Sequence, residues 1–201
     1  TALMMFERGE IDYFNGIPDA DFIRLKRHPK FQRRREQVEG VGPNYISLNC
    51  EMPPFTNRLV RQAMNYAVNK ERIVKANHDR AVVARGVLPP AVKGFNPDLP
   101  GYTDNPDKAR KLLAEAGVTN GFTVTFWIYQ RALNDALRVQ HDLAAVGITA
   151  QLNVVSLPAL LEAGQRRKTV PMAIWDWMAT INDPKDTLDF LVNGERIVED
   201  G

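Results

Sequence analysis

The sequence has one cysteine, no long hydrophobic run and none of the short motifs that mark common catalytic sites. Cys50 has no second cysteine in this chain with which to form a disulfide, and no Cys/His cluster is spaced to hold a metal ion. We therefore expect Cys50 to be a small buried residue beside the end of a strand. No window approaches the ~20 uninterrupted apolar residues that a membrane-spanning helix needs. These absences exclude an internal disulfide framework, and they predict neither a metal site nor a transmembrane helix.

Motifs for catalysis are also missing. The sequence has no G-x-S-x-G, no H-E-x-x-H, no phosphate-binding loop and no dinucleotide fingerprint. Its three histidines, His28, His78 and His141, are dispersed, and a lone histidine supplies no catalytic triad. We predict a protein that is not an enzyme, with no catalytic residues and no cofactor. The alternative is a hydrolase or transferase on an α/β lobe, which would need a nucleophile with a base in hydrogen-bond reach.

Charge of either sign is nearly balanced, with 26 basic and 24 acidic residues. The basic runs at 33–35 and 166–168 are short and lack aromatic platforms, which is typical of solvated faces and predicts no nucleic-acid partner. With 201 residues and 44% apolar composition, the chain can bury a sizeable core and form one or two domains. It passes from Thr1 straight into an apolar helical pattern, so we expect an internal piece of a longer protein.

Two amphipathic helices have clear boundaries. In the first, apolar residues recur at helical spacing after a candidate N-cap, Asn57, and Asn69 can cap the helix that follows. In the second, Asn105 is the candidate N-cap, Pro106 occupies the first helical position and Gly117 terminates the helix. The apolar stripes that we expect to be buried are Val60, Ala63, Met64, Ala67 and Val68 in the first helix, and Ala109, Leu112, Leu113 and Ala116 in the second.

The second half of the chain alternates between strand and helix patterns. Apolar residues alternate over 122–128 and 148–154, and a helical pattern fills about 133–146 between them. This order predicts a βαβ unit with parallel strands. A third apolar strand is predicted from Pro171 to Trp177, after a short helix capped by Ser156. The fold class that we predict is therefore α/β, an open sheet flanked by helices.

The first part of the chain has a less regular pattern. We predict a short helix, a strand at Ile11 to Phe14, a helix near Asp19 to Arg27 and a polar strand around Phe31 to Glu39, as in the tail of an α/β lobe. A further strand is predicted from Asn44 to Asn49, with Tyr45 on one face of it.

Candidate binding residues follow from the geometry of open α/β sheets, in which ligands lie outside the carboxyl ends of parallel strands. Tyr129, Gln130 and Arg131 follow the first parallel strand, and residues 178–182 follow the third. Trp175 and Trp177 share a strand face that can be core or cleft. Asp183 precedes Pro184 and can be either a helix cap or a ligand contact.

Two segments carry a resemblance to a known family. Residues 53–74, PPFTNRLVRQAMNYAVNKERIV, and residues 102–117, with Asn105-Pro106 and a terminal Glu-Ala-Gly, resemble signature segments of the family 5 extracellular solute-binding proteins. Gly9-Glu10-Ile11-Asp12 is similar to the segment that closes the first lobe in that family. The resemblance implies a type II periplasmic-binding-protein lobe with a mixed sheet and part of a second lobe. It implies the end of lobe I at 1–42, a hinge strand at 43–49 and an incomplete lobe II at 50–201.

The resemblance also bears on specificity. In peptide-binding members, the run (G/A)-W-x-x-D-x-x-(D/E)-P places an aspartate against the ligand's α-ammonium group and a tryptophan at the pocket border. Trp177 and Asp183-Pro184 match this run, but Thr180 occupies the aspartate's place. A threonine hydroxyl cannot make the charge-assisted contact. We therefore expect a sugar, an opine-like or other polar solute, or a peptide whose amine is held elsewhere.

The function implied by the resemblance is solute capture for an ABC importer. Two lobes close around a peptide or other small polar solute, and the receptor delivers it to a membrane permease. The ligand-binding residues implied by the resemblance and the strand ends are Tyr45, Tyr129, Gln130, Trp177 and Thr180. The implied location is periplasmic or extracellular, associated with the membrane through the permease, and the protein is expected to be a monomer. A sensor module built from the same lobes is an alternative that the residues do not separate from transport.

Overall fold

The computed structural model describes residues 2–14, 17, 19–32, 40–177, 179 and 181–193. The chain divides into two compact units. Unit 1 comprises Thr1–Val38 and Val74–Val82, and unit 2 comprises Glu39–Ile73 and Val83–Gly201. Helix α5 (Lys70–Ala76) crosses the boundary between them.

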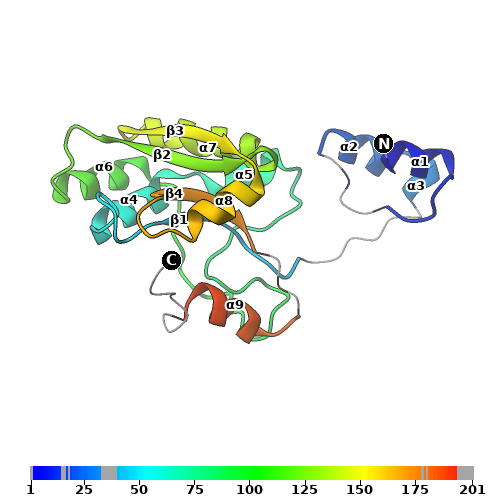
Figure 1. Cartoon of the computed structure of the whole chain (residues 1–201). Coiled ribbons are helices and arrows are strands. Elements are labelled where there is room, and N and C mark those ends of the chain that lie inside the picture. Colours follow the sequence, from blue (N-terminus) through cyan, green and yellow to red (C-terminus); the bar gives the residue numbers. More distant parts are fainter. Residues whose placement is uncertain are drawn as a thin grey trace. The chain divides into compact units, whose positions relative to one another are not determined.

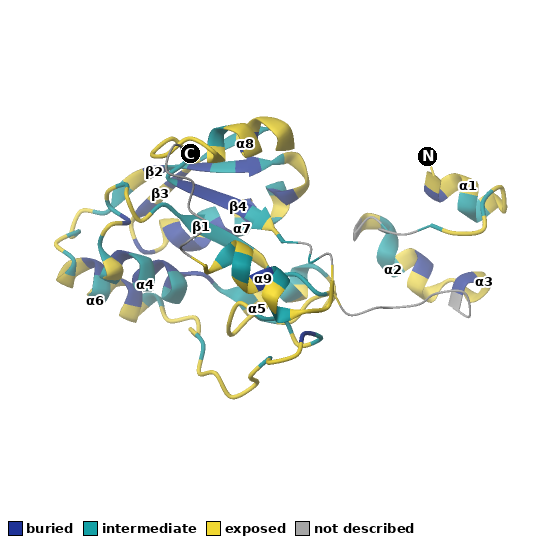
Figure 2. Ribbon diagram, turned by 60° about the horizontal axis from the view of Figure 1, so that its bottom comes forward, coloured by how far each residue is buried: buried dark blue, intermediate teal, exposed yellow. Residues whose placement is uncertain are grey.

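The described part of unit 1 contains three helices before residue 33, namely α1 (Ala2–Arg8), α2 (Asp19–Arg27) and α3 (Pro29–Gln32). Leu3, Leu25 and Phe31, one from each helix, form a small buried cluster. Partly buried Phe6 and Phe14 pack against this cluster. A core this small leaves most of the surface of unit 1 exposed to solvent (Figure 2).

Two strand predictions in this region are wrong or lie outside the described residues. Residues 11–14 form no strand, because Phe14 turns inward to the helical cluster and no neighbouring strand is present among the described residues. Phe31 and Gln32 belong to α3 rather than to a polar strand, since burial of the Phe31 ring against Leu3 fixes the local structure. Residues 33–39, the remainder of that predicted strand, lie outside the described residues.

Unit 2 contains a four-stranded open mixed sheet, as predicted (Figure 1). The strand order is β1-β4-β2-β3, with β1 (Asn44–Leu48), β2 (Phe122–Tyr129), β3 (Ile148–Val155) and β4 (Met172–Asp176). Strand β2 is parallel to both β3 and β4, whereas β1 is antiparallel to β4. Three strands therefore end at one edge of the sheet, and β1 begins at that edge. We call it the carboxyl edge.

The predicted βαβ unit is confirmed. Strand β2 passes through a short 3-10 turn, η1 (Gln130–Ala132), into α7 (Leu133–Ala144), and β3 returns parallel to it. Alternate residues of β2 point to the core: Phe126 and Ile128 are both 0% exposed. Gly121 precedes β2 with a φ of +68°, and a Cβ there would lie 1.9 Å from the carbonyl oxygen of Gly147. Only glycine can occupy this close approach between the two strand entrances.

Helices α4 (Arg58–Ala67) and α6 (Pro106–Glu115) complete this core, together with α7 (Figures 1 and 2). Both predicted caps are formed: the side chain of Asn57 accepts from the Leu59 N–H at 2.9 Å, and that of Asn105 accepts from the Lys108 N–H at 2.9 Å. The predicted apolar stripes are buried or packed against the core. Residues 77–105, all of which are described, contain no helix or strand.

A buried carboxylate that the sequence analysis did not single out connects these helices. Asp142 of α7 is 8% exposed and accepts from the backbone N–H of Asn69 at 3.0 Å. It also forms an ion pair with Arg72 of α5. Asn69 itself caps α5, as predicted, by accepting from the Arg72 N–H at 2.7 Å. One carboxylate thus fixes the α4–α5 corner against α7.

Two further helices lie outside this core. Helix α8 (Leu157–Gly164), capped by Ser156, covers the opposite face of the sheet (Figure 1). Helix α9 (Pro184–Leu191) begins at Asp183, whose side chain accepts from the Lys185 N–H at 2.8 Å. The expectation for Cys50 is wrong: its side chain is exposed, because β1 ends at Leu48 and Cys50 lies in the turn beyond it. None of the helices formed by the described residues has both the length and the apolarity to span a membrane.

Candidate functional site

The carboxyl edge brings together residues from three strands. Antiparallel pairing places Asn44 opposite Asp176 and Tyr45 opposite Trp175. The pairing of β1 with β4 continues one residue further, because the Trp177 N–H donates to the Pro43 carbonyl at 2.9 Å. Strand β2 is parallel to β4 on its other side, so Tyr129 ends beside the last residues of β4.

Asp176 is the centre of this group. The Tyr129 hydroxyl donates a hydrogen bond to Oδ1 of Asp176. Tyr45 lies close enough on the other side for the charge of Asp176 to act on its phenol. The Asp176 side chain is exposed, and both tyrosines are half-buried. A carboxylate that accepts a hydrogen bond from one phenol, with a second phenol within reach of its charge, thus lies at an edge that is open to solvent.

Burial and this carboxylate together keep the phenols protonated. Burial is the larger cause of the raised pKa of Tyr129, and its hydrogen bond to Asp176 is the next. The pKa of Tyr45 is raised first by burial and then by the charge of Asp176. Both hydroxyls therefore remain hydrogen-bond donors at neutral pH.

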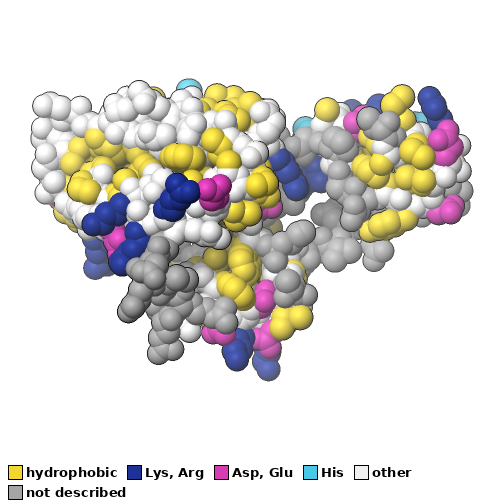
Figure 3. Space-filling view, viewed as in Figure 1, with side chains coloured by type: hydrophobic (Ala, Val, Ile, Leu, Met, Phe, Trp, Pro, Cys, Tyr) yellow, Lys and Arg dark blue, Asp and Glu magenta, His cyan; other side chains and the backbone are white. Residues whose placement is uncertain are grey.

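Trp177 lies at the same edge but its ring faces α9. The indole centroid is 5.0 Å from that of Phe190. The indole Nε1–H is buried and has no acceptor among the described residues. A buried donor without a partner costs about 1–3 kcal/mol of desolvation free energy. Figure 3 shows hydrophobic side chains beside acidic and basic ones on the surface around α9.

The other candidate residues have different outcomes. Gln130 is exposed and begins η1, one residue beyond Tyr129. Thr180 lies outside the described residues. Trp175 packs into the face covered by α8: its Nε1–H donates to Ser47 Oγ at 2.9 Å, and a Cβ on Gly164 of α8 would lie 3.5 Å from its ring. Asp183 is occupied as the cap of α9.

Asp176 is the residue that the sequence analysis missed. Strict alternation along β4 directs it away from the face of Trp175, so the analysis gave it no part in the cleft. The contact with Tyr129 depends on the register of β4 against β2, which local sequence does not specify. The available signal was a carboxylate at the last position of an apolar strand, where ligand groups approach in open α/β sheets.

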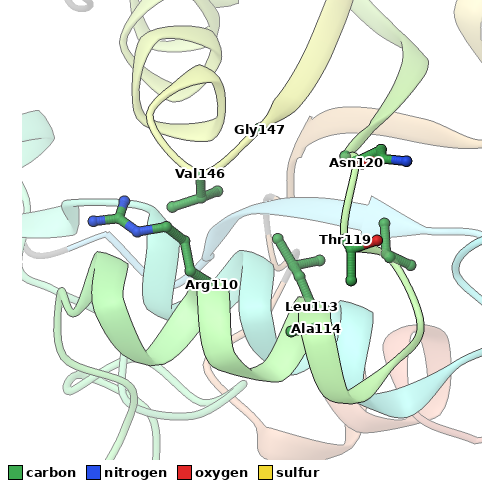
Figure 4. A pocket seen from close by; sticks show the side chains of 9 residues that line it. Arg110, Leu113, Ala114, Thr119, Asn120, Val146 and Gly147 are labelled. Atoms are coloured by element: carbon green, nitrogen blue, oxygen red, sulfur yellow. The ribbon is translucent and has the colours of Figure 1, made fainter.

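A separate pocket of 360 Å³ lies at the opposite edge of the sheet, before β2 and β3 begin (Figure 4). Arg110 is the titratable residue of its lining, and its guanidinium donates to Asp107 at 2.9 Å and to the Ala145 carbonyl at 3.0 Å. The other lining residues are Leu113, Ala114, Val118, Thr119, Asn120, Gly121, Val146 and Gly147. This pocket contains no residue of the carboxyl edge.

The side chains at the carboxyl edge are suited to noncovalent recognition of a ligand. It offers one carboxylate, two phenols, an amide and an indole, which can attract a charge, exchange hydrogen bonds and cover an apolar surface. Among the described residues, no group of three or more histidine, cysteine or acidic side chains could hold a metal ion. The arrangement favours noncovalent binding of a small polar molecule.

Comparisons with known proteins agree with this interpretation. Heme-binding protein A of Haemophilus influenzae is 34% identical over 186 residues, which are 89% of this chain and 34% of that protein. The periplasmic binding protein DppA from Helicobacter pylori, solved in complex with the peptide STSA, superposes with a TM-score of 0.78 at 28% identity over 93% of this chain and 36% of that one. MoaA from A. tumefaciens R10, in complex with mannopinic acid, superposes with a TM-score of 0.75 at 27% identity over 92% of this chain and 38% of that one.

The chain spans about a third of the length of the curated relatives that it matches. The structural neighbours are periplasmic binding proteins, so the fold is that of a type II binding-protein lobe. The family profile described as bacterial extracellular solute-binding proteins, family 5 Middle, matches residues 1–197. Its members bind solutes and are not enzymes. The match extends the resemblance seen at residues 53–74 and 102–117 to nearly the whole sequence. The chain therefore belongs to the family 5 extracellular solute-binding proteins.

Proposed function

We propose that this chain supplies half of the binding cleft of an ABC-importer solute receptor, which closes two lobes around a small polar solute and delivers it to a membrane permease. The observation that carries the proposal is the Asp176–Tyr129 contact beside Tyr45, because it brings three strands' polar groups together at the edge where open α/β sheets bind ligands. Residues 50–201 form most of lobe II, 43–49 the hinge strand and 1–42 the end of lobe I.

The receptor closes because it binds the solute more tightly in the closed state than in the open state. A receptor of this kind closes because the solute contacts both lobes in the closed state and only one in the open state. Tyr45 belongs to β1, the strand proposed as the hinge, so a solute at the carboxyl edge contacts the segment that bends. The receptor acts as a monomer, outside the cytoplasmic membrane, and its membrane partner is the permease.

The solute class is peptide-like or another small polar molecule. The relatives named above carry heme, a peptide or mannopinic acid in their names or titles, so membership of the family is compatible with chemically different solutes. Thr180 provides no charge at the position where the peptide-binding pattern has an aspartate. The proposal therefore favours a solute whose charged group is recognised elsewhere in the cleft.

Native mass spectrometry of the intact protein as purified tests the proposal. A noncovalently bound solute that is released on denaturation, and that stabilises the emptied protein when it is added back, is the expected result. Thr180→Asp is the companion variant, and gain of dipeptide affinity is expected from it. Tight dipeptide binding by the unaltered protein would contradict the inference from Thr180. Failure of any released or added solute to bind the intact protein would contradict solute capture itself.

A further inference from the structure

An asparagine followed by a glycine lies in a turn at the entrance to β2. The sequence contains three such pairs, which begin at positions 15, 120 and 193. The structure describes both residues of one pair, Asn120 and Gly121. Asn120 is exposed, and its side-chain amide points away from Leu113 and Val146 (Figure 4). No hydrogen bond from the described residues fixes this amide, so it can rotate toward the backbone of the next residue.

Asparagine is a thermolabile residue because its side chain can react with the following peptide group. At this pair, the backbone nitrogen of Gly121 would attack Cγ of Asn120. The bond from Cγ to the side-chain nitrogen breaks, and ammonia leaves with the proton of the attacking nitrogen. The product is a five-membered succinimide ring. Water then adds to either carbonyl group of the ring, which opens to aspartate or to isoaspartate. One water molecule is consumed, one ammonia is released, and a neutral amide becomes a carboxylate.

Glycine at position 121 favours this reaction. It has no side chain to block the approach of its nitrogen to Cγ, and its backbone reaches conformations that other residues avoid. The fold also excludes other residues at this position. Gly121 has a φ of +68°, and a Cβ there would lie 1.9 Å from the Gly147 carbonyl oxygen. The close approach of the two strand entrances therefore retains the residue that makes Asn120 reactive.

We propose that Asn120 is a site of spontaneous modification, at which the protein gains aspartate and isoaspartate without an enzyme. This inference goes beyond the proposed function and does not depend on it. Aspartate would add a negative charge to the pocket that Arg110 also lines, with the backbone unchanged. Isoaspartate would in addition lengthen the main chain by the β-carbon of residue 120. We expect isoaspartate to disturb the fit between Gly121 and Gly147 and to loosen the paired starts of β2 and β3.

Peptide mapping of the intact protein tests the proposal. Samples held in warm, mildly alkaline buffer are digested at intervals, and mass spectrometry detects the mass increase that accompanies loss of the amide. Electron-transfer fragmentation separates aspartate from isoaspartate. Asn182 is the internal control, because it is exposed and lies outside helices and strands but precedes an aspartate. We expect Asn120 to convert about tenfold faster than Asn182, with isoaspartate among the products. Equal rates, or no conversion of Asn120, would overturn the proposal.

Variants connect the modification with the strand entrance. Asn120→Ser cannot form the succinimide, so its thermal midpoint should fall less during the incubation than that of the wild type. Asn120→Asp has the charge of one product on a normal backbone, and its midpoint should lie within about 2 °C of the wild-type value. The wild type should lose about 3 °C or more as isoaspartate accumulates. Asn182→Ser is the matched control and should change with time as the wild type does. Equal falls in the wild type and in Asn120→Ser would refute the predicted loosening of β2 and β3.

Discussion

The βαβ core and the segment at 177–193 lie in the same unit but differ in how completely their polar groups are paired. In the core, Phe126, Ile128 and Leu143 are 0% exposed, and the buried carboxylate of Asp142 contacts the Asn69 N–H, Arg72 and His141. Among the described residues, two buried side-chain polar atoms lack a hydrogen-bond partner, namely Trp177 Nε1 and Thr187 Oγ1. Both lie in this segment. The segment also exposes apolar side chains, namely Ile181, Leu188, Phe190 and Val192.

This difference suggests that the core and the segment have different roles in the unit. The core fixes the strand ends and thereby the position of the carboxyl edge. The described residues of the segment beside that edge expose several apolar side chains and include two buried polar atoms without a described partner, features that are typical of regions of lower local stability. Binding sites commonly combine a rigid scaffold with a less stable neighbouring element.

The largest expected contrast compares two phenylalanines. Phe126→Ala removes a fully buried ring from the sheet and should reduce the free energy of unfolding by about 3–5 kcal/mol. Phe190→Ala removes a ring that is 55% exposed and should cost less than about 1.5 kcal/mol, mainly through the lost contact with Trp177. Urea unfolding of both variants with unchanged m-values measures the contrast. Equal losses would show that α9 belongs to the cooperative core.

A second contrast uses two aspartates. Asp142→Ala removes the acceptor of the Asn69 N–H and the ion-pair partner of Arg72, and it should cost about 2–3 kcal/mol, a value moderated because Arg72 is half exposed. Asp183→Ala removes only the cap of α9 and should cost about 1 kcal/mol. Hydrogen exchange should show general loss of protection in the first variant and loss confined to α9 in the second. Loss of protection throughout the sheet in Asp183→Ala would contradict the comparison.

Thr187→Val is expected to stabilise the protein by about 1 kcal/mol. The substitution replaces a buried hydroxyl that has no partner in the described part of the chain by a methyl group of similar shape, which removes a desolvation cost. Thr149→Val, on the exposed face of β3, is the matched control and should change stability by less than about 0.5 kcal/mol. The thermal midpoints of both variants provide the measurement. Destabilisation by Thr187→Val would mean that its hydroxyl has a partner in solution.

The smallest effect concerns alkaline pH. The pKa values of Tyr45 and Tyr129 are raised in the folded protein, so the folded state holds their protons more tightly than the unfolded state. Their contribution to stability is complete below the unfolded pKa of about 10 and is lost as the pH rises through the folded values. Unfolding midpoints at pH ~9 and ~11 should therefore fall less in Tyr129→Phe than in the wild type. Identical slopes would argue against the Tyr129–Asp176 contact.

Local signals in the sequence were sufficient for much of the fold. The caps at Asn57, Asn105 and Asp183 and the alternation in 122–128 predicted elements that the structure contains, because each signal depends on residues within one turn or strand. The predicted strand at 11–14 failed because an alternating pattern forms a strand only when another strand is available for pairing.

The site was less predictable for the same reason. The ends of β2 and β4 could be located from the sequence, and with them Tyr129 and Trp177. The contact between Tyr129 and Asp176 spans 47 residues and depends on strand register, which a single sequence does not fix. The direction of the Trp177 ring depends on α9, whose packing follows from tertiary contacts rather than from its own pattern.

The surroundings of the Trp177 indole N–H have an optical consequence. The Trp175 N–H donates to Ser47, whereas the Trp177 N–H has no acceptor among the residues that the structure describes, so the two indoles, two positions apart, are in different electronic environments. Replacing Trp127 and Trp175 by phenylalanine would leave Trp177 as the one tryptophan of these 201 residues. Its fluorescence wavelength and lifetime would then report, without any attached dye, the moment at which the chain beside β4 gains a polar neighbour.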